Sequence, residues 1–266
     1  MGDVNKSILL IILLFIAVAF VLLKLKKIHI RFNFGSKEKE VPKNYEIAAL
    51  LEEINNEITV AAQAYFAWKS IHNIASKDSS IHKAINSNAL SWNIILHSLQ
   101  STFFISIGRI FDTNPQSCSI HLLFSQCKKS INEFEKSGLG KRRIIEAGKE
   151  PDYLSDFLKN AYEPKPSDFS SLKKNVSRVQ KIYEEHFRPV RHKVFAHKDS
   201  DHISDTSLLF AGTTIADAED ILGTLYKVER VIWDLYTNGH EMNFSYWELK
   251  EEEYILENIE SLLKKL

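Results

Sequence analysis

An uncharged stretch near the N-terminus constrains this chain more than any other feature. Residues 7–23 read SILLIILLFIAVAFVLL, seventeen residues without a charged side chain. As a helix the run would rise ~26 Å, against roughly 30 Å of hydrocarbon in a bilayer. Lys24, Lys26 and Lys27 follow it and can extend their ammonium groups to the interface. The pattern predicts a single transmembrane helix from Ser7 to Leu23.

A buried core helix and a cleaved signal peptide are the alternative interpretations. A core helix is seldom apolar on every side at the extreme N-terminus, beside a basic cluster. A signal peptide carries its charges before the apolar run and a small-residue cleavage site after it, whereas KLKK follows this run. We therefore interpret residues 1–31 as an uncleaved anchor with a basic flank.

The orientation of the anchor follows from its flanking charges. Three lysines and Arg31 follow the span, whereas only Lys6 and Asp3 precede it. Basic flanks stay on the cytoplasmic side of a membrane. We expect a single-pass protein of the inner or plasma membrane, with its N-terminus outside and everything after the span in the cytoplasm.

The remainder of the chain is predicted to be all-α. With 9 Gly and 6 Pro in 266 residues, it has too few turn-forming residues for the many short strands of a sandwich or barrel. Residues 32–43 are polar and contain Gly35 and Pro42, which is typical of a flexible linker. Residues 44–266 then form one cytoplasmic helical bundle.

Apolar residues at three- and four-residue steps predict the helices of this bundle. Two long amphipathic helices, at about 44–76 and 80–111, are expected to form an antiparallel hairpin. The pattern predicts further helices at these ranges: 120–129, 152–160, 168–198, 214–238 and 246–266. Ser167 and Thr214 are the expected N-caps of two of them. Glycines and prolines make residues 130–166 otherwise irregular.

Charge is distributed unevenly along a chain whose formal net charge is zero. Residues 128–198 carry 17 basic and 10 acidic side chains, whereas residues 199–266 carry 5 and 15. An anionic ligand would therefore meet the middle segment, which has a net charge of +7. The neutral total and the acidic end count against broad affinity for RNA, because sequence-independent binding needs many phosphate contacts.

The sequence predicts no metal site and no cofactor. Cys118 and Cys127 are too few for a disulfide scaffold and fit a reduced compartment, and with His121 between them they match no zinc spacing. His192, His197 and His202 are five residues apart. Five residues turn a helix by ~140°, away from the four-residue spacing that lets two imidazoles share an ion.

The segment most informative about chemistry is 187–199, FRPVRHKVFAHKD. Pro189 interrupts the backbone hydrogen bonds of the expected helix, so a kink is predicted there. An apolar stripe that includes Val190 and Val194 continues onto His197, so His197 could be a packed core histidine and Arg191 a solvated neighbour. On residue types alone, this structural interpretation is favoured.

A resemblance to a known family changes that balance. Arg191-His192-x4-His197 resembles the R-x(4–6)-H motif of HEPN domains (higher eukaryotes and prokaryotes nucleotide-binding), and RHKVFAHKD is similar to its abortive-infection U-type form. Residues 90–123 resemble that family's earlier helix, which ends in an Arg-x-x-Asp element, here Arg109 and Asp112. The resemblance covers roughly residues 45–240. Two departures are the anchor and the absence of a Tyr after His197, the residue that marks the subgroup silenced by nucleotide transfer.

The resemblance implies a metal-independent endoribonuclease in which the 2′-hydroxyl of RNA attacks its own phosphate. Such a reaction needs a group that titrates near neutrality and a fixed cation. His197 would be the general base or acid and Arg191 the charge clamp. His192 would orient either of these residues or contact RNA, while Arg188 and Lys193 would make secondary phosphate contacts.

A homodimer is expected for a geometric reason. Six residues separate Arg191 from His197, about 120° around a straight α-helix and ~9 Å along it. Two chains packed side by side could point both groups at one phosphate, as the family's dimers do, and a membrane anchor would favour this association. We expect a role in phage defence or stress, with an antitoxin or other regulator that the sequence does not identify. The competing hypotheses are a non-catalytic HEPN-like scaffold or sensor and a nucleotide-binding module that uses the same two residues.

Overall fold

The computed structural model describes residues 46–196 and 207–266. These residues belong to one compact unit, Asn44–Leu266. They form helices joined by loops, with no strand in the two described ranges, and the predicted all-α fold is confirmed. The anchor predicted at residues 7–23 lies outside the described residues. Within them, no helix is long and apolar enough to span a bilayer.

The helices follow one another along the chain with short connections. The long ones are α2 (Ile47–Lys77), α4 (Ala89–Ile110), α8 (Pro166–Ile182) and α11 (Ile215–Asn238). The shorter ones are α3 (Ser79–Ser87), α5 (Ile120–Lys129), α6 (Lys136–Ala147), α7 (Leu154–Asn160), α9 (Arg188–Val190), α10 (Ser207–Phe210) and α12 (Glu251–Leu263). A 3-10 turn, η1 (Ile131–Phe134), and two π-helical segments, η2 (Tyr183–Phe187) and η3 (Arg191–Ala196), complete the described part.

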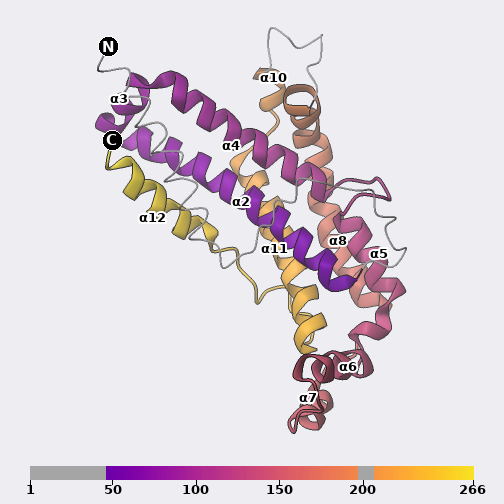
Figure 1. Cartoon of the computed structure of the whole chain (residues 1–266). Helices are drawn as coiled ribbons and strands as arrows, with labels where there is room; N and C mark the ends of the chain where they lie inside the picture. The colour runs from indigo at the N-terminus through magenta and orange to yellow at the C-terminus, as the bar shows by residue number, and fades with distance from the viewer. Residues whose placement is uncertain (1–45, 197–206) are drawn as a thin grey trace, which may run out of the picture. The chain divides into compact units, whose positions relative to one another are not determined.

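The hairpin of α2 and α4 is confirmed (Figure 1). Apolar residues of α2 such as Ile54 and Ile58 are buried, and Ile107 of α4 is buried in the same core. The connection contains the short helix α3, whose N-cap Asp78 accepts hydrogen bonds from the backbone N–H groups of Ser80 and Ile81. A cap of this kind satisfies donors that a helix start leaves unpaired.

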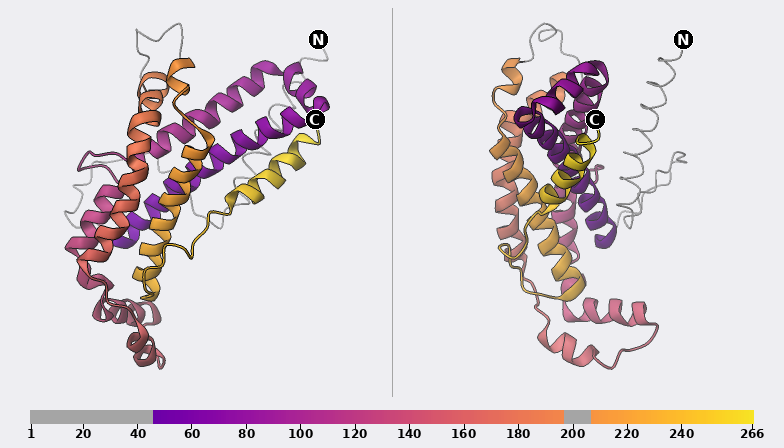
Figure 2. Two further views of the ribbon diagram at one scale, coloured as in Figure 1. Left: turned by 180° about the vertical axis from the view of Figure 1, so that it is seen from behind. Right: turned by 90° about the vertical axis from the view of Figure 1, so that its left-hand side faces the viewer.

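α8 and α11 pack against each other, and α11 also packs on α2, which closes the core (Figure 2). Aromatic and aliphatic side chains from all of these helices form one continuous cluster. α12 lies along α2, where Lys69 forms ion pairs with Glu219 of α11 and Glu252 of α12. The site described below is therefore built on a packed helical frame.

Several predicted helix boundaries are confirmed and others are corrected. Thr214 caps α11 by accepting from the N–H of Asp217, and Gly239 ends that helix with a φ of 65°, as glycine readily does. The N-cap predicted at Ser167 is wrong, because α8 already begins at Pro166, the first-turn position at which proline's missing N–H costs nothing. The last helix begins at Glu251 rather than near position 246.

Residues 130–166 are more helical than predicted, because two glycines that suggested loops lie inside α6. A Cβ on Gly138 would lie 2.6 Å from the carbonyl oxygen of Glu133, so the preceding turn leaves no room for a side chain. Gly140 is buried beneath Leu158 of α7. These glycines let neighbouring segments pack close to α6 and do not mark a reversal of the chain.

Candidate functional site

The helix that carries the Arg-x5-His segment departs from α-helical geometry on both sides of Pro189. The N–H of Arg188 donates to the carbonyl of Tyr183, five residues earlier, as in a π-helix. Pro189 has no N–H to continue an α-helical ladder, which accounts for the interruption there. π-helical turns inside α-helices are rare and often occur at functional sites. The helix is therefore π-helical on both sides of Pro189, and the kink predicted there stays a prediction.

This geometry corrects one premise of the sequence analysis. The expected angle and rise between Arg191 and His197 assume a straight α-helix. Residues 191–196 are instead π-helical, with a different number of residues per turn. The estimate of 120° between the two side chains therefore does not apply. His197 itself lies outside the described residues.

η3 packs along α4, and aromatic contacts fix its position. The ring of Phe195 stacks on Phe104, with 5.1 Å between centroids, and lies 5.5 Å from the imidazole of His97. Four residues before Phe195, Arg191 packs against Gly108 of α4. Phe104 and Gly108 are themselves four residues apart, so they lie on one face of α4. The two contacts together set the position of the Arg191 side chain.

Gly108 is required for this packing. A Cβ on Gly108 would lie 2.5 Å from Nε of Arg191 and 2.9 Å from its Cδ, both too short for non-bonded atoms. The arginine side chain therefore lies directly against the helix backbone. Such close approach is possible only where a residue has no side chain.

Arg191 is half-buried, and its Nε is buried without a hydrogen-bond partner in the described part of the chain. A buried donor without a partner costs free energy and calls for an explanation. The aromatic ring of Tyr183, stacked on Phe111 with 4.9 Å between centroids, lies in the same neighbourhood. The guanidinium thus has hydrogen-bonding capacity that the fold leaves unused.

Asp112 interacts electrostatically with Arg191, but its carboxylate accepts hydrogen bonds from other groups. Its two oxygens accept from the backbone N–H of Asn114 and from the hydroxyl of Ser117. These bonds, and then the positive charge of Arg191, hold the pKa of Asp112 below its usual value. Asp112 therefore contributes a fixed negative charge near Arg191 without closing an ion pair with it.

The Arg-x-x-Asp element is split between two partners. Arg109 is exposed and its Nη1 lies 3.0 Å from Oε1 of Glu57 on α2, whereas Asp112 lies toward Arg191. Of the two residues of this element, which the resemblance suggested as auxiliary site residues, the structure brings only Asp112 near Arg191. Arg109 instead links α2 to α4.

The other predicted auxiliary residues lie on the same helical segment. Arg188 and His192 are exposed, and Lys193 is half-buried. His192 and Lys193 both have interaction partners. Exposed basic groups beside Arg191 are compatible with an anionic ligand, since positive charge attracts phosphate over several ångströms.

The cysteine and histidine residues of the α5 region form no metal site. Cys118 and Cys127 are both free thiols. Burial, and secondarily Glu53 and Glu57, raise the pKa of Cys118 to about 11, which makes the thiolate scarce at neutral pH. No group of three His, Cys, Asp or Glu side chains within residues 46–196 and 207–266 could hold a metal ion.

Two residues of the site carried no signal in the sequence. Gly108 gives no such signal, because a glycine inside a helix does not reveal what packs on it. Tyr183 is buried in the core like an apolar residue of the helix, yet it interacts electrostatically with both Arg191 and Asp112. An aromatic residue on a stripe does not show by its position that it borders a charged site.

The comparison with protein-family models decides the relationship. A model described as AbiU2, of the HEPN type, matches residues 45–257. The chain belongs to the AbiU2 family of HEPN domains. The match includes α2 to α11, and thus both Arg191 and the Gly108 helix that supports it. No curated protein and no solved structure matches the chain.

Proposed function

We propose that this AbiU2-type HEPN protein is a metal-independent endoribonuclease that acts in phage defence or stress, tethered to the membrane by residues 7–23. The observation that carries the proposal is Arg191, packed on Gly108 with a buried, unpartnered Nε. By contrast, other arginines are paired with carboxylates: Arg109, Arg142, Arg143, Arg178 and Arg230. An unpaired guanidinium in a half-buried position is suited to a phosphate.

The proposed reaction is a transesterification within RNA. The 2′-oxygen attacks the adjacent phosphorus and loses its proton, the bond from phosphorus to the 5′-oxygen breaks, and that oxygen gains a proton. Arg191 would stabilise the negative charge that develops on the phosphorane, because a fixed cation needs no reorganisation as the charge forms. His197 would transfer one of the two protons, since an imidazole titrates near neutral pH.

A homodimer is part of the proposal. The packing of Arg191 against α4 uses one face of the η3 segment, and a second chain could supply a histidine to the same phosphate. The tether would raise the local concentration of chains and favour that association. Analytical ultracentrifugation of the detergent-solubilised full chain should give a dimer, and a strict monomer at high micromolar concentration would contradict a composite site.

Cleavage assays on the full chain test the chemistry. Wild-type protein should cut RNA in the presence of EDTA and leave 2′,3′-cyclic phosphate ends. Arg191→Ala and His197→Ala should each lower the rate by ~10²–10⁴-fold, the range typical of losing an acid–base or charge-stabilising group. Arg191→Lys should also be impaired, because an ammonium cannot form the two-pronged contact of a guanidinium.

Three outcomes would contradict the proposal in different ways. Intact RNA after incubation with folded wild-type protein would favour a non-catalytic scaffold, or nucleotide binding at the same residues. Activity that disappears with EDTA would indicate a metal mechanism. Unchanged cleavage by both alanine variants would mean that other residues carry the reaction.

A further inference from the structure

Three polar side-chain atoms in the described part of the chain are buried without a hydrogen-bond partner. They are Oε2 of Glu57, Nε2 of His121 and Nε of Arg191, on α2, α5 and η3. Each of the three side chains is half-buried as a whole, so part of it faces solvent. Folded proteins leave few such atoms, and each calls for an explanation. The proposed reaction accounts for Arg191 and leaves the other two unexplained.

All three side chains border the C-terminal end of α4. Arg191 packs on this end of the helix, and Oε1 of Glu57 accepts a hydrogen bond from Nη1 of Arg109 there, at 3.0 Å. Asp112 follows the helix and interacts electrostatically with both Arg191 and His121. Unused hydrogen-bonding capacity from three separate elements is therefore gathered in one place, as expected where a ligand completes a site.

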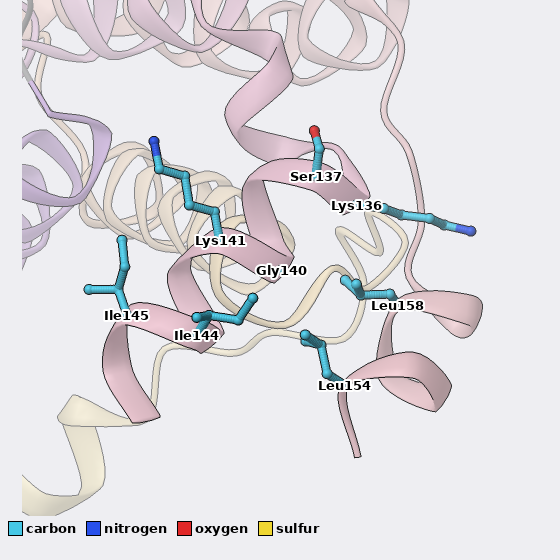
Figure 3. A pocket seen from close by; sticks show the side chains of 8 residues that line it. All are labelled: Lys136, Ser137, Gly140, Lys141, Ile144, Ile145, Leu154 and Leu158. Carbon is cyan, nitrogen blue, oxygen red and sulfur yellow. The ribbon is translucent and has the colours of Figure 1, made fainter. Parts of the chain in front are cut away.

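The open groove between α6 and α7 does not share this property. It has a volume of about 440 Å³, and Figure 3 shows Ile144, Leu154 and Leu158 around it. None of the three buried, unpartnered atoms belongs to a residue that lines this groove. The end of α4 is therefore the better place for a ligand that forms hydrogen bonds.

The packing of α5 explains how His121 reaches the end of α4. α5 lies against α8 (Figure 1), and Nζ of Lys128 in its last turn donates to Oγ of Ser170 in the first turn of α8, at 3.1 Å. The first turn of α5, which carries His121, is therefore directed toward the far end of α8, where Tyr183 follows. The ring of Tyr183 stacks on Phe111 at the end of α4, with 4.9 Å between centroids. The start of α5 and the end of α4 are thus brought together beside η2.

The imidazole of His121 is neutral at physiological pH. Burial, and then the charge of Lys173, lower its pKa, while Glu184 and Asp112 act in the opposite direction. One nitrogen of a neutral imidazole is an acceptor, whereas the guanidinium of Arg191 has donors only. A ligand that matches both groups carries an anionic oxygen close to a hydroxyl group. A ribonucleotide has this combination, because its 2′-hydroxyl lies next to the 3′-phosphate.

We propose that His121 is a second ligand-contacting residue of the Arg191 site, and that its imidazole recognises the 2′-hydroxyl of an RNA nucleotide whose phosphate lies on Arg191. This role rests on the proposed function, from which the choice of RNA follows. The ring accepts the hydrogen of the hydroxyl, which is the nucleophile of the proposed reaction. His121 then takes the proton that leaves the 2′-oxygen, and His197 gives a proton to the 5′-oxygen. A deoxynucleotide lacks the hydroxyl and loses this contact.

Binding of two nucleotides that cannot be cleaved tests this contact on the full chain. Calorimetry compares adenosine 3′-monophosphate with its 2′-deoxy counterpart. Wild-type protein should bind the ribonucleotide about tenfold more tightly, the effect of a single hydrogen bond. His121→Leu and His121→Phe, two variants of different shape, should bind both nucleotides with the affinity of the deoxynucleotide. Arg191→Ala should weaken the binding of both nucleotides, because they share the phosphate.

The matched control is His72→Phe, toward the other end of α2 from Glu57, where the imidazole lies 4.5 Å from the ring of Trp68 between centroids. This variant should keep the preference of the wild type. Equal affinity of the wild type for the two nucleotides, no binding of either, or an unchanged preference in a folded His121 variant would overturn the proposal. A preference that depends on His121 in a protein that cuts no RNA would support this contact and contradict the ribonuclease activity instead.

Discussion

Two half-buried arginines in this molecule differ in how their hydrogen-bonding capacity is used. On α11, Glu229 is completely buried, and both of its oxygens accept hydrogen bonds from Arg230, at 2.6 and 2.9 Å. Arg230 also lies over the ring of Trp233, 4.8 Å from its centroid. At η3, by contrast, Arg191 packs on Gly108 with Nε buried and unpartnered.

The difference separates a structural role from a binding role. A buried carboxylate is tolerated only when a cation and good hydrogen bonds offset its lost hydration, and Arg230 supplies both. No hydrogen-bond acceptor among the described residues offsets the lost hydration of the buried Nε of Arg191. A fold retains such a group more readily when a ligand satisfies it, so we interpret Arg230 as part of the core and Arg191 as part of the site.

The largest expected stability effect would sharpen this contrast. Arg230→Ala leaves the charge of Glu229 buried and unpaired, which should lower the free energy of unfolding by about 3–5 kcal/mol. Arg191→Ala removes no ion pair and should cost less than about 1 kcal/mol. Urea denaturation of the two variants measures both values. Equal destabilisation would contradict the assignment of different roles.

The pH dependence of stability should have opposite signs in the two regions. Burial raises the pKa of Glu229 despite the nearby Arg230. The contribution of Glu229 to folding stability is therefore present at low pH and is lost as pH rises through the folded pKa. Hydrogen bonds from Asn114 and Ser117 lower the pKa of Asp112, so its contribution is present above the unfolded pKa and is lost as pH falls through the folded one.

A pair of isosteric variants measures this smaller effect. Asp112→Asn should reduce the loss of stability on acidification below about pH 4, by only a few tenths of a kcal/mol because Asp112 is half-buried and partly screened by solvent. Glu229→Gln should instead reduce the loss of folding stability as pH rises above about 4.5, the ordinary pKa of a glutamate side chain. Urea midpoints from pH 3 to 7 supply the data. Shifts of the same sign in both variants would contradict the comparison.

The sequence was sufficient for the frame of this fold. The three- and four-residue steps of Ile54, Ile58 and Ile107 predicted the α2–α4 hairpin, because the period of apolar residues is set by the faces that must be buried. Thr214 marked the start of α11 through its capping chemistry. α6 was missed because Gly138 and Gly140 suggest loops unless the tight packing around them is known.

The candidate site could be predicted only in part. The motif identified Arg191, but not the glycine on which it packs, since the partner of a helix face is set by tertiary structure. The apolar stripe through Val190 and Val194 fits an ordinary α-helix, so it gave no sign of π-helical turns. The pattern also could not reveal that Arg109 faces Glu57 while Asp112 faces the site.

The central claim is that Gly108 positions Arg191 for an anionic ligand, and one substitution tests it most directly. Gly108→Ala places a Cβ 2.5 Å from Nε and 2.9 Å from Cδ of Arg191, so the arginine side chain must move. The matched control is Gly223→Ala on α11, where a Cβ meets nothing within 4 Å. In the control, the better helix propensity of alanine should raise stability by about 0.5–1 kcal/mol without changing cleavage.

The decisive measurement is the initial rate of RNA cleavage by folded Gly108→Ala and Gly223→Ala protein, side by side with wild type. We expect Gly108→Ala to lose ~10–100-fold in rate, because displacing a catalytic group by about 1 Å can have that cost. Gly223→Ala should cleave RNA at the wild-type rate. A folded Gly108→Ala protein that cleaves RNA as fast as wild type would contradict the claim that this contact positions Arg191 for catalysis.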